Sequence, residues 1–370
     1  MPALESITIK GFKSIASVEK LLLRPINVVI GPNGAGKSNF IGIFEFLRAI
    51  REGKLQDYVA RAGGAERILH FGSKHTDAVH IKIAFQDWVN QYEIVLEPTD
   101  ADELVPSEEW GYYWDKARYP NGPMGKPFAR QGKEAGVSRD HLRGIGHFVA
   151  GHLERWRVYH FHDTSSSSPM KKTCEVNDNR ALRADGSNLA PFLHRLRQQF
   201  PASYDLIRKS VQRVAPFFDD FRLEPTALNP DKIRLEWKHK RSDAYFDAAA
   251  LSDGTLRFIA LATLLLQPEI LRPSVILVDE PELGLHPYAV ALLAALVRQA
   301  SGQTQVILST QSPQLLDHFE PEDILVASQK DGGTAFDRLD PARLEDWLQD
   351  YSLGQLWEKG EFGGRPGEGG

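Results

Sequence analysis

Three short apolar runs, each followed at once by polar residues, are the clearest pattern in the chain; they occupy residues 26–30, 275–278 and 305–308. Runs of this length without alternation are typical of buried strands. After the first run, Phe40, Ile43, Leu47 and Ile50 recur near helical spacing, which predicts an amphipathic helix opened by Ser38. Further helices are predicted over residues 189–200, 204–214 and 256–266. The pattern therefore predicts an α/β protein.

The segment between the first strand and its helix reads Gly31-Pro32-Asn33-Gly34-Ala35-Gly36-Lys37-Ser38, which fits the phosphate-binding P-loop pattern. Glycines let the backbone N–H groups turn toward phosphate oxygens, and the helix N-terminus adds partial positive charge. We expect Lys37 to reach the β- and γ-phosphates and Ser38 to ligate Mg²⁺, so the predicted cofactors are ATP and Mg²⁺. The nucleotide-binding residues expected in this segment are Gly31, Asn33, Gly34, Gly36, Lys37, Ser38 and Asn39.

The second apolar run ends in Asp279 and Glu280, which is the pattern of a Walker B strand. Asp279 would hold Mg²⁺ through water, and Glu280 would act as general base. A strand ending in a solvated acidic turn is the alternative, but the flanking segments argue against it. Leu251-Ser252-Asp253-Gly254-Thr255 precedes the predicted helix over 256–266, and Pro281-Glu282-Leu283-Gly284-Leu285-His286-Pro287 follows the carboxylates. The third run leads into Ser309-Thr310-Gln311-Ser312-Pro313.

This order of motifs resembles the ATPase heads of the ABC superfamily, above all the branch of RecF, SMC and OLD-type proteins. Residues 7–15 resemble the first strand and turn of that branch, and residues 279–287 resemble the same run in compact ATPases of the AAA-21 type. The likeness extends to residues 185–190 and 351–354 and spans nearly the whole chain. It implies a P-loop NTPase fold of the ABC-head type, with a mixed β-sheet lobe and a helical lobe. It also implies a homodimer in which one copy presents Ser252 and Gly254 to the γ-phosphate held by the other.

The chain departs from the family pattern at three points. Asp253 replaces a glycine of the transporter signature Leu-Ser-Gly-Gly-Gln. Gln311 stands where a switch histidine is usual; glutamine can hydrogen-bond a phosphate oxygen or the attacking water but cannot carry a proton. The expected catalytic residues are therefore Lys37, Glu280 and Gln311, with Glu280 as the only clear base. The third point is the Q-loop glutamine, for which Gln86, after a predicted strand over 79–85, is only a candidate. The alternative is that Gln86 is an ordinary polar residue at a strand end.

Composition narrows the class without naming the function. The apolar and charged fractions of the 370 residues are those of an ordinary globular protein. A single cysteine, Cys174, excludes an intramolecular disulfide and fits a reducing cytosol. Zinc is not expected, because the histidines at 141, 147, 152, 160 and 162 lack a matching ligand set and are interpreted as surface or core residues. With neither a signal-peptide pattern nor an apolar run of about 20 residues, we expect a cytoplasmic protein without a membrane partner.

The chain is expected to divide into three parts. Residues 1–98 would form the nucleotide-binding lobe, 99–242 an inserted basic and mainly helical subdomain, and 243–370 the signature, Walker B and switch lobe with a flexible, Gly-rich C-terminal tail. Residues 150–241 hold 17 Lys and Arg against 11 Asp and Glu, whereas the whole chain carries a formal net charge of −5. This excess predicts an anionic partner such as DNA or RNA, with a solvated helical face as the alternative. The aromatic cluster at 110–114 could stack on bases or pack inside a hairpin.

The sequence therefore leads to one main hypothesis and two alternatives. The main hypothesis is an ATP-hydrolysing ABC-type head that dimerises around ATP and acts in nucleic-acid maintenance or phage defence with a partner effector protein. The alternatives are an ATPase subunit of an ABC transporter and an OLD-like nuclease-associated ATPase. Residues 7–15 and 281–287 argue against the transporter subunit. Fewer than 60 residues follow Pro313, which argues against a nuclease domain behind the head.

Overall fold

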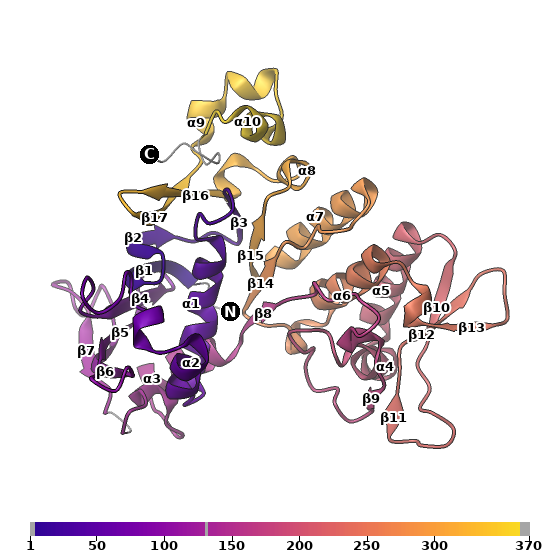
Figure 1. The fold of residues 1–370 in the computed structure, drawn as a ribbon, viewed down its shortest axis with the longest axis horizontal. Coiled ribbons are helices and arrows are strands. Elements are labelled where there is room, and N and C mark those ends of the chain that lie inside the picture. The colour runs from indigo at the N-terminus through magenta and orange to yellow at the C-terminus, as the bar shows by residue number, and fades with distance from the viewer. Residues whose placement is uncertain (1–3, 130–131, 363–370) are drawn as a thin grey trace.

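A central, mostly parallel sheet runs between two lobes (Figure 1). The computed structural model describes residues 4–129 and 132–362, so the tail expected at 363–370 lies outside the described residues. The sheet order is β17-β16-β3-β15-β14-β8, and only the β16–β17 pairing is antiparallel. Its strands are β3 Ile26–Ile30, β8 Trp156–Tyr159, β14 Val275–Asp279, β15 Gln305–Thr310, β16 Ile324–Lys330 and β17 Gly333–Arg338. The three predicted strands are thus confirmed, and they are neighbours.

Burial of both faces explains why these strands read as unbroken apolar runs. Val28, Ile276 and Val306 belong to the core on the side of the helical lobe. The next residues along each strand, Val29, Leu277 and Ile307, belong to the core on the side of α1, because successive side chains point to opposite faces. Apart from Asn27 and Gln305, which are buried near the start of β3 and β15, the side chains of these three strands are apolar on both faces until the carboxyl ends.

The first lobe packs an antiparallel sheet around the helix that follows the P-loop (Figure 1). The sheet order is β2-β1-β4-β5-β6-β7. Its strands and the lobe's helices are β1 Leu4–Phe12, β2 Ile15–Leu22, β4 Val79–Phe85, β5 Asn90–Pro98, β6 Leu104–Tyr113, β7 Met124–Pro127, α1 Lys37–Arg51, α2 Leu55–Ala62 and α3 Ile145–Glu154. Strand β6 pairs with β5 from Asn90–Tyr113 to Pro98–Leu104, so the boundary expected after residue 98 falls inside a hairpin. The Trp110 and Tyr112 rings stack on each other on β6, with 6.3 Å between their centroids. This agrees with the alternative in which the aromatic cluster packs inside a hairpin.

The second lobe is built of helices with small strands at its edge (Figure 1). Its elements are β9 Cys174–Glu175, α4 Leu189–Gln199, α5 Pro201–Val214, β10 Phe218–Arg222, β11 Lys232–Ile233, β12 Glu236–His239, β13 Tyr245–Asp247 and α6 Asp253–Leu266. The helices predicted over 189–200, 204–214 and 256–266 are confirmed. Residues 99–242 do not form one inserted subdomain: they supply β6 and β7 to the first lobe, β8 to the central sheet and only their later part to the helical lobe.

The remaining helices follow the Walker B strand. They are α7 Pro287–Ser301, α8 Pro313–Leu316, α9 Pro341–Leu344 and α10 Leu353–Lys359. Helix α7 packs against α6 and the central sheet, while α8 to α10 lie at the C-terminal end of the molecule (Figure 1). Along residues 4–129 and 132–362, no helix combines the length and the apolar character needed to cross a bilayer.

Candidate nucleotide site

The P-loop connects β3 to α1 through three glycines with positive φ. Gly31, Gly34 and Gly36 have φ of 156°, 81° and 97°, of which the last two lie well inside the left-handed region. A Cβ on Gly36 would lie 2.1 Å from the Thr334 hydroxyl oxygen, so this position requires glycine. A Cβ on Gly34 would meet nothing within 4 Å, so the loop faces open space there. Since α1 has no side-chain cap, its first N–H groups are available for a phosphate.

Lys37 lies under this loop as a buried cation. Its ammonium donates to the carbonyls of Gly31 at 2.7 Å and Pro32 at 3.0 Å. Burial lowers its pKa, while the charges of Asp279 and Glu280 oppose that shift. Lys37 is therefore close enough to the Walker B carboxylates to interact with them electrostatically. Ser38 and Asn33 are exposed beside it.

Glu280 follows β14 with a backbone φ of 41°, an uncommon conformation for a residue with a side chain. Its N–H donates to the Ser309 carbonyl at 2.8 Å, which fixes the turn against β15. Its carboxylate accepts a hydrogen bond from the Gln311 amide at 2.9 Å. Backbone strain of this kind persists only where the surroundings hold it, and it is concentrated at functional sites. The structure thus brings Glu280 and Gln311 together, as the motif order predicted.

Glu282 is a third carboxylate at this edge of the sheet, and no role was predicted for it from the motifs. It accepts a hydrogen bond of 2.5 Å from the Thr310 hydroxyl. Burial raises its pKa, and the charge of Glu280 adds to the shift. Its second oxygen and the Ser309 hydroxyl are buried without a hydrogen-bond partner in the part of the chain that the structure describes. Such unpaired polar atoms beside Asp279 fit a site built for a polar ligand.

The signature segment lies at the start of α6, in the lobe opposite α1 (Figure 1). The Ser252 hydroxyl caps the helix by accepting from the Thr255 N–H at 3.2 Å, and its side chain is exposed. A Cβ on Gly254 would lie 2.3 Å from the Gly284 carbonyl oxygen, so the helix packs directly on the loop after the Walker B strand. Ser252 is therefore exposed on a different lobe from the P-loop, whereas Gly254 packs on the loop that follows β14.

His160 and His162, which were interpreted from the sequence as surface or core residues, lie beside the Walker B carboxylates. They follow β8, which pairs in parallel with β14, so the polar ends of the two strands meet at one edge of the sheet. The charge of Asp279 acts on both imidazoles. A hydrogen bond to the Glu45 carboxylate raises the pKa of His160, whereas burial lowers the pKa of His162. The sequence carries no clear signal for β8, because Arg157 interrupts its apolar residues.

Arg257 connects this edge to the signature helix. It lies on α6 and is 5% exposed. Its guanidinium donates to the carbonyls of Phe161 at 2.9 Å and His162 at 3.0 Å. Burial lowers its pKa, and the carboxylates of Asp253, Glu282 and Glu280 oppose the shift. A displacement of α6 would therefore be transmitted to the segment that carries His162.

A hydroxyl cluster on the other side of the P-loop was also missed. The Asn39 amide donates to the Ser14 hydroxyl at 2.7 Å, and that hydroxyl lies 2.8 Å from the Thr334 hydroxyl.

Gln86, the candidate for the Q-loop glutamine, lies in the turn between β4 and β5 and accepts a hydrogen bond from Asn90. This agrees with the alternative interpretation of Gln86 as an ordinary polar residue at a strand end.

Part of the positive charge of the helical lobe is engaged within the lobe. Arg195 donates to the carbonyls of Asn179 and Arg180, and Arg197 donates to the carbonyl of Leu223. Arg208 and Lys209 both pair with Asp205. Less positive charge is therefore available to an external anion than the residue count indicates.

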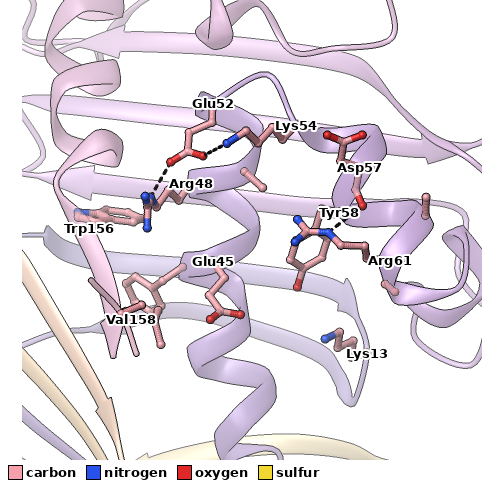
Figure 2. Close-up of a pocket in the computed structure, with 15 residues that line it drawn as sticks. Lys13, Glu45, Arg48, Glu52, Lys54, Asp57, Tyr58, Arg61, Trp156 and Val158 are labelled. Carbon is pink, nitrogen blue, oxygen red and sulfur yellow. Dashed lines mark hydrogen bonds and ion pairs between the residues drawn. The ribbon is translucent and has the colours of Figure 1, made fainter. Parts of the chain in front are cut away.

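A hollow of about 940 Å³ lies beside the outer face of α1, away from the P-loop (Figure 2). Its charges are mostly paired: Glu52 binds Arg48 and Lys54, and Glu45 hydrogen-bonds His160. Lys13 lies at its border (Figure 2). This hollow has the character of an ionic network rather than of a phosphate site.

The chain has an α/β fold of the P-loop NTPase type that is shared with SMC ATPase heads. Two solved structures support the fold. The chain matches an SMC head bound to the C-terminal winged-helix domain of ScpA at 17% identity and a TM-score of 0.60, covering 94% of this chain and 100% of that one. It also matches the SMC head domain with an extended coiled coil, bound to the C-terminal domain of ScpA derived from Pyrococcus furiosus, at 16% identity and a TM-score of 0.60, covering 95% and 99%.

Residues 26–317 match the family described as "AAA domain, putative AbiEii toxin, Type IV TA system". The chain therefore belongs to this AAA_21 family, and the resemblance drawn from its motifs is confirmed. No curated protein matches the chain.

Proposed function

We propose that this protein binds ATP with Mg²⁺ and hydrolyses it in a site shared between two copies of the chain. One observation carries the proposal: Lys37, Asp279, Glu280 and Gln311 meet at the carboxyl edge of β3, β15 and β14, beside the uncapped start of α1. Ligands of open α/β sheets bind at this edge. The expected roles of Gly31, Asn33, Gly34, Gly36, Ser38 and Asn39 in nucleotide binding remain part of the proposal.

The residues at this edge fit ATP and Mg²⁺. The P-loop N–H groups and Lys37 would hold the phosphates. Ser38 and Asp279 offer the two protein oxygens that are typical of a Mg²⁺ site, in which water completes the coordination. Bound Mg²⁺ would supply positive charge against the phosphate oxygens. The unpaired oxygen of Glu282 and the unpaired hydroxyl of Ser309 leave further polar atoms for this shell.

The chain itself would supply the base and its orientation. Glu280 would accept a proton from the attacking water, and the 2.9 Å hydrogen bond from Gln311 would hold the carboxylate in place. Because Gln311 donates to Glu280, it positions the base rather than competes with it. Lys37 would stabilise charge that develops on the phosphate.

A second copy would complete the site. Ser252 is exposed on the lobe opposite the P-loop, and Gly254 follows it in the first turn of α6, so this segment would reach a nucleotide held by another molecule. ATP bound between two heads would stabilise the dimer by mass action, and hydrolysis would release it. Arg257 gives this contact a route to the Walker B edge through the Phe161 and His162 carbonyls.

For the biological role, we propose antiviral defence or nucleic-acid maintenance together with a partner effector protein, in the cytoplasm. The family description names a toxin of a type IV toxin–antitoxin system, which supports the first of these roles. The SMC heads that share the fold were solved with ScpA domains bound, which supports a protein partner. A DNA or RNA partner has less support, because Arg208 and Lys209 pair with Asp205, and Arg195 and Arg197 donate to backbone carbonyls of the same lobe.

The test is a steady-state assay of phosphate release from ATP with Mg²⁺. We expect hydrolysis by the wild-type chain and loss of both ATP binding and hydrolysis in Lys37→Ala. Lys209→Ala, which removes an exposed cation of the other lobe, is the matched control and should leave both unchanged. A wild-type protein that binds ATP but never releases phosphate would contradict the hydrolytic part of the proposal.

A further inference from the structure

Phe71 exposes its ring in an unfavourable backbone conformation. It presents 68% of its surface to solvent and has a φ of 56°. Bulky residues rarely adopt positive φ, because the Cβ atom meets the backbone. A ring that buries so little apolar surface contributes little to folding. Both features point to a role outside the core.

The segment around Phe71 is firmly held. The N–H of His70 donates to the Gly11 carbonyl at 3.1 Å, and its imidazole Nδ1 lies 2.7 Å from the Lys13 carbonyl. The Thr76 hydroxyl donates to the His70 carbonyl at 2.5 Å. These bonds attach the segment to the turn between β1 and β2, so the exposed ring has a defined position.

One hairpin links this ring to the P-loop. Gln329 on β16 donates to the Gly34 carbonyl at 3.0 Å, and Thr334 on β17 lies against Gly36. Between them, the Cβ position of Gly332 lies 3.8 Å from a ring carbon of Phe71. Thr334 and Gly332 are two residues apart, so their Cα atoms are separated by at most about 7 Å, although Gly332 lies in the turn before β17. A ribose can bridge a distance of this size between a phosphate and a base.

A hollow of about 570 Å³ lies next to the ring and is lined by Lys13, Glu66, Arg67, Leu69, Phe71 and Gly72. Lys13 lies at the border between this hollow and the one beside α1 (Figure 2). The hollow beside α1 is bordered by paired charges, whereas this one has an exposed aromatic face. Stacking of a base on such a face tolerates any base, because every base has a π-face.

We propose that Phe71 is the platform on which the base of the nucleotide at the P-loop stacks, with Lys13 beside the ribose. This inference rests on the proposed function, since a nucleotide at the P-loop is what supplies the base. It adds a residue for base binding that no motif marks. Stacking without hydrogen-bond readout also implies that guanine nucleotides bind nearly as well as adenine nucleotides.

The test compares ADP with pyrophosphate by isothermal titration calorimetry with Mg²⁺, because the two differ by the nucleoside and neither contains a γ-phosphate. We expect Phe71→Gly to raise the Kd for ADP about tenfold or more and to leave the Kd for pyrophosphate unchanged. Phe71→Trp should keep the affinity, and ADP should quench its fluorescence. Phe217→Ala removes a 41% exposed ring of the helical lobe and should change neither Kd.

Thermal melting separates this role from a structural one. Glycine accepts positive φ, so Phe71→Gly should melt at or above the wild-type Tm. A lower Tm with equal weakening of ADP and pyrophosphate would mean that the ring supports the fold, and the inference would be overturned. Wild-type affinity for ADP in Phe71→Gly would also overturn it. A wild-type protein that binds neither ligand would overturn the proposed function and this inference with it.

Discussion

The Gln311 side-chain amide donates a 2.9 Å hydrogen bond to the Glu280 carboxylate. The two residues end neighbouring strands, β15 and β14, and the Glu280 N–H is bonded to the Ser309 carbonyl of β15 as well. Glu280 is therefore held through both its backbone and its side chain. A histidine in place of Gln311 could exchange a proton with the carboxylate, whereas an amide can only orient it.

Glu280→Gln should retain ATP binding and lose nearly all hydrolysis, because an amide cannot accept the proton of the attacking water. We expect a rate loss of about 10²- to 10⁴-fold. Phosphate release measures the rate, and light scattering with and without ATP measures whether a long-lived dimer accumulates. A variant that hydrolyses ATP at the wild-type rate would exclude Glu280 as the base.

Gln311→Leu should slow hydrolysis about 10- to 100-fold, the loss expected for one hydrogen bond to a charged group. Gln311→His keeps a donor and should retain most of the rate. The Kd for ATP should stay within about twofold in both variants, because Gln311 acts on the base rather than on the phosphates. Equal loss in both variants would show that the amide itself has another role.

The local part of this site was readable from the sequence. The strand over 26–30 and the helices over 189–200 and 256–266 are signalled by residues that are close in the chain. The P-loop and Walker B residues follow such strands directly. Their meeting at one sheet edge follows because parallel strands place their carboxyl ends together.

The remainder depends on pairings between residues far apart in the chain. Val275 pairs with Trp156 across the central sheet, and nothing local to 156–162 announces that partner, so His162 was assigned elsewhere. Strand β6 continues the first lobe because it pairs with β5. The charge count over 150–241 indicated a basic surface, but it could not reveal that Asp205 and several carbonyls use that charge.

Acid should destabilise the protein in two successive pH windows that overlap only slightly. Burial lowers the pKa of His152 from 6.5 to about 4, and its ring packs on Phe85 and Phe148. The unfolded chain therefore binds a proton that the folded chain excludes, so stability is lost as pH falls from about 6.5 to 4. This loss amounts to about 3 kcal/mol.

The second window belongs to Glu93. A hydrogen bond from His80 is the main cause of the lowering of the Glu93 pKa to about 2, so the contribution of Glu93 to stability is lost between about pH 4.5 and 2.

Urea unfolding at a series of pH values measures both windows. His152→Gln should flatten the dependence of the unfolding free energy between pH 6.5 and 4 and leave the lower window intact. Glu93→Gln should do the reverse. A wild-type protein whose stability is constant between pH 6.5 and 4 would contradict the buried, neutral state of His152.

Gly36→Ala should deform the P-loop, because its Cβ would approach the Thr334 hydroxyl to 2.1 Å and the φ of 97° disfavours alanine. We expect a loss of about 1–3 kcal/mol in unfolding free energy, together with weaker ATP binding. Gly34 also has a positive φ, but a Cβ there would meet no atom, so Gly34→Ala should lower the unfolding free energy less than Gly36→Ala does. Adding Thr334→Ala to Gly36→Ala should restore part of the stability, as calorimetric melting would show. No difference between the two glycine variants would contradict the packing of the hairpin on the P-loop.

Ser252→Arg should block hydrolysis by placing a bulky, unpaired charge where two heads close. Its own P-loop stays intact, so ATP binding to the monomer should be unchanged. Mixed in equal amounts with Lys37→Ala, it should form heterodimers in which one of two shared sites is intact, and about one quarter of the wild-type rate should return on random pairing.

Ala202→Arg, which changes an exposed residue on α5 of the same lobe, is the matched control and should hydrolyse ATP normally. Phosphate release from each variant and from the mixture is the measurement. Normal hydrolysis by Ser252→Arg alone, or an inactive mixture, would show that Ser252 does not complete a site on another copy.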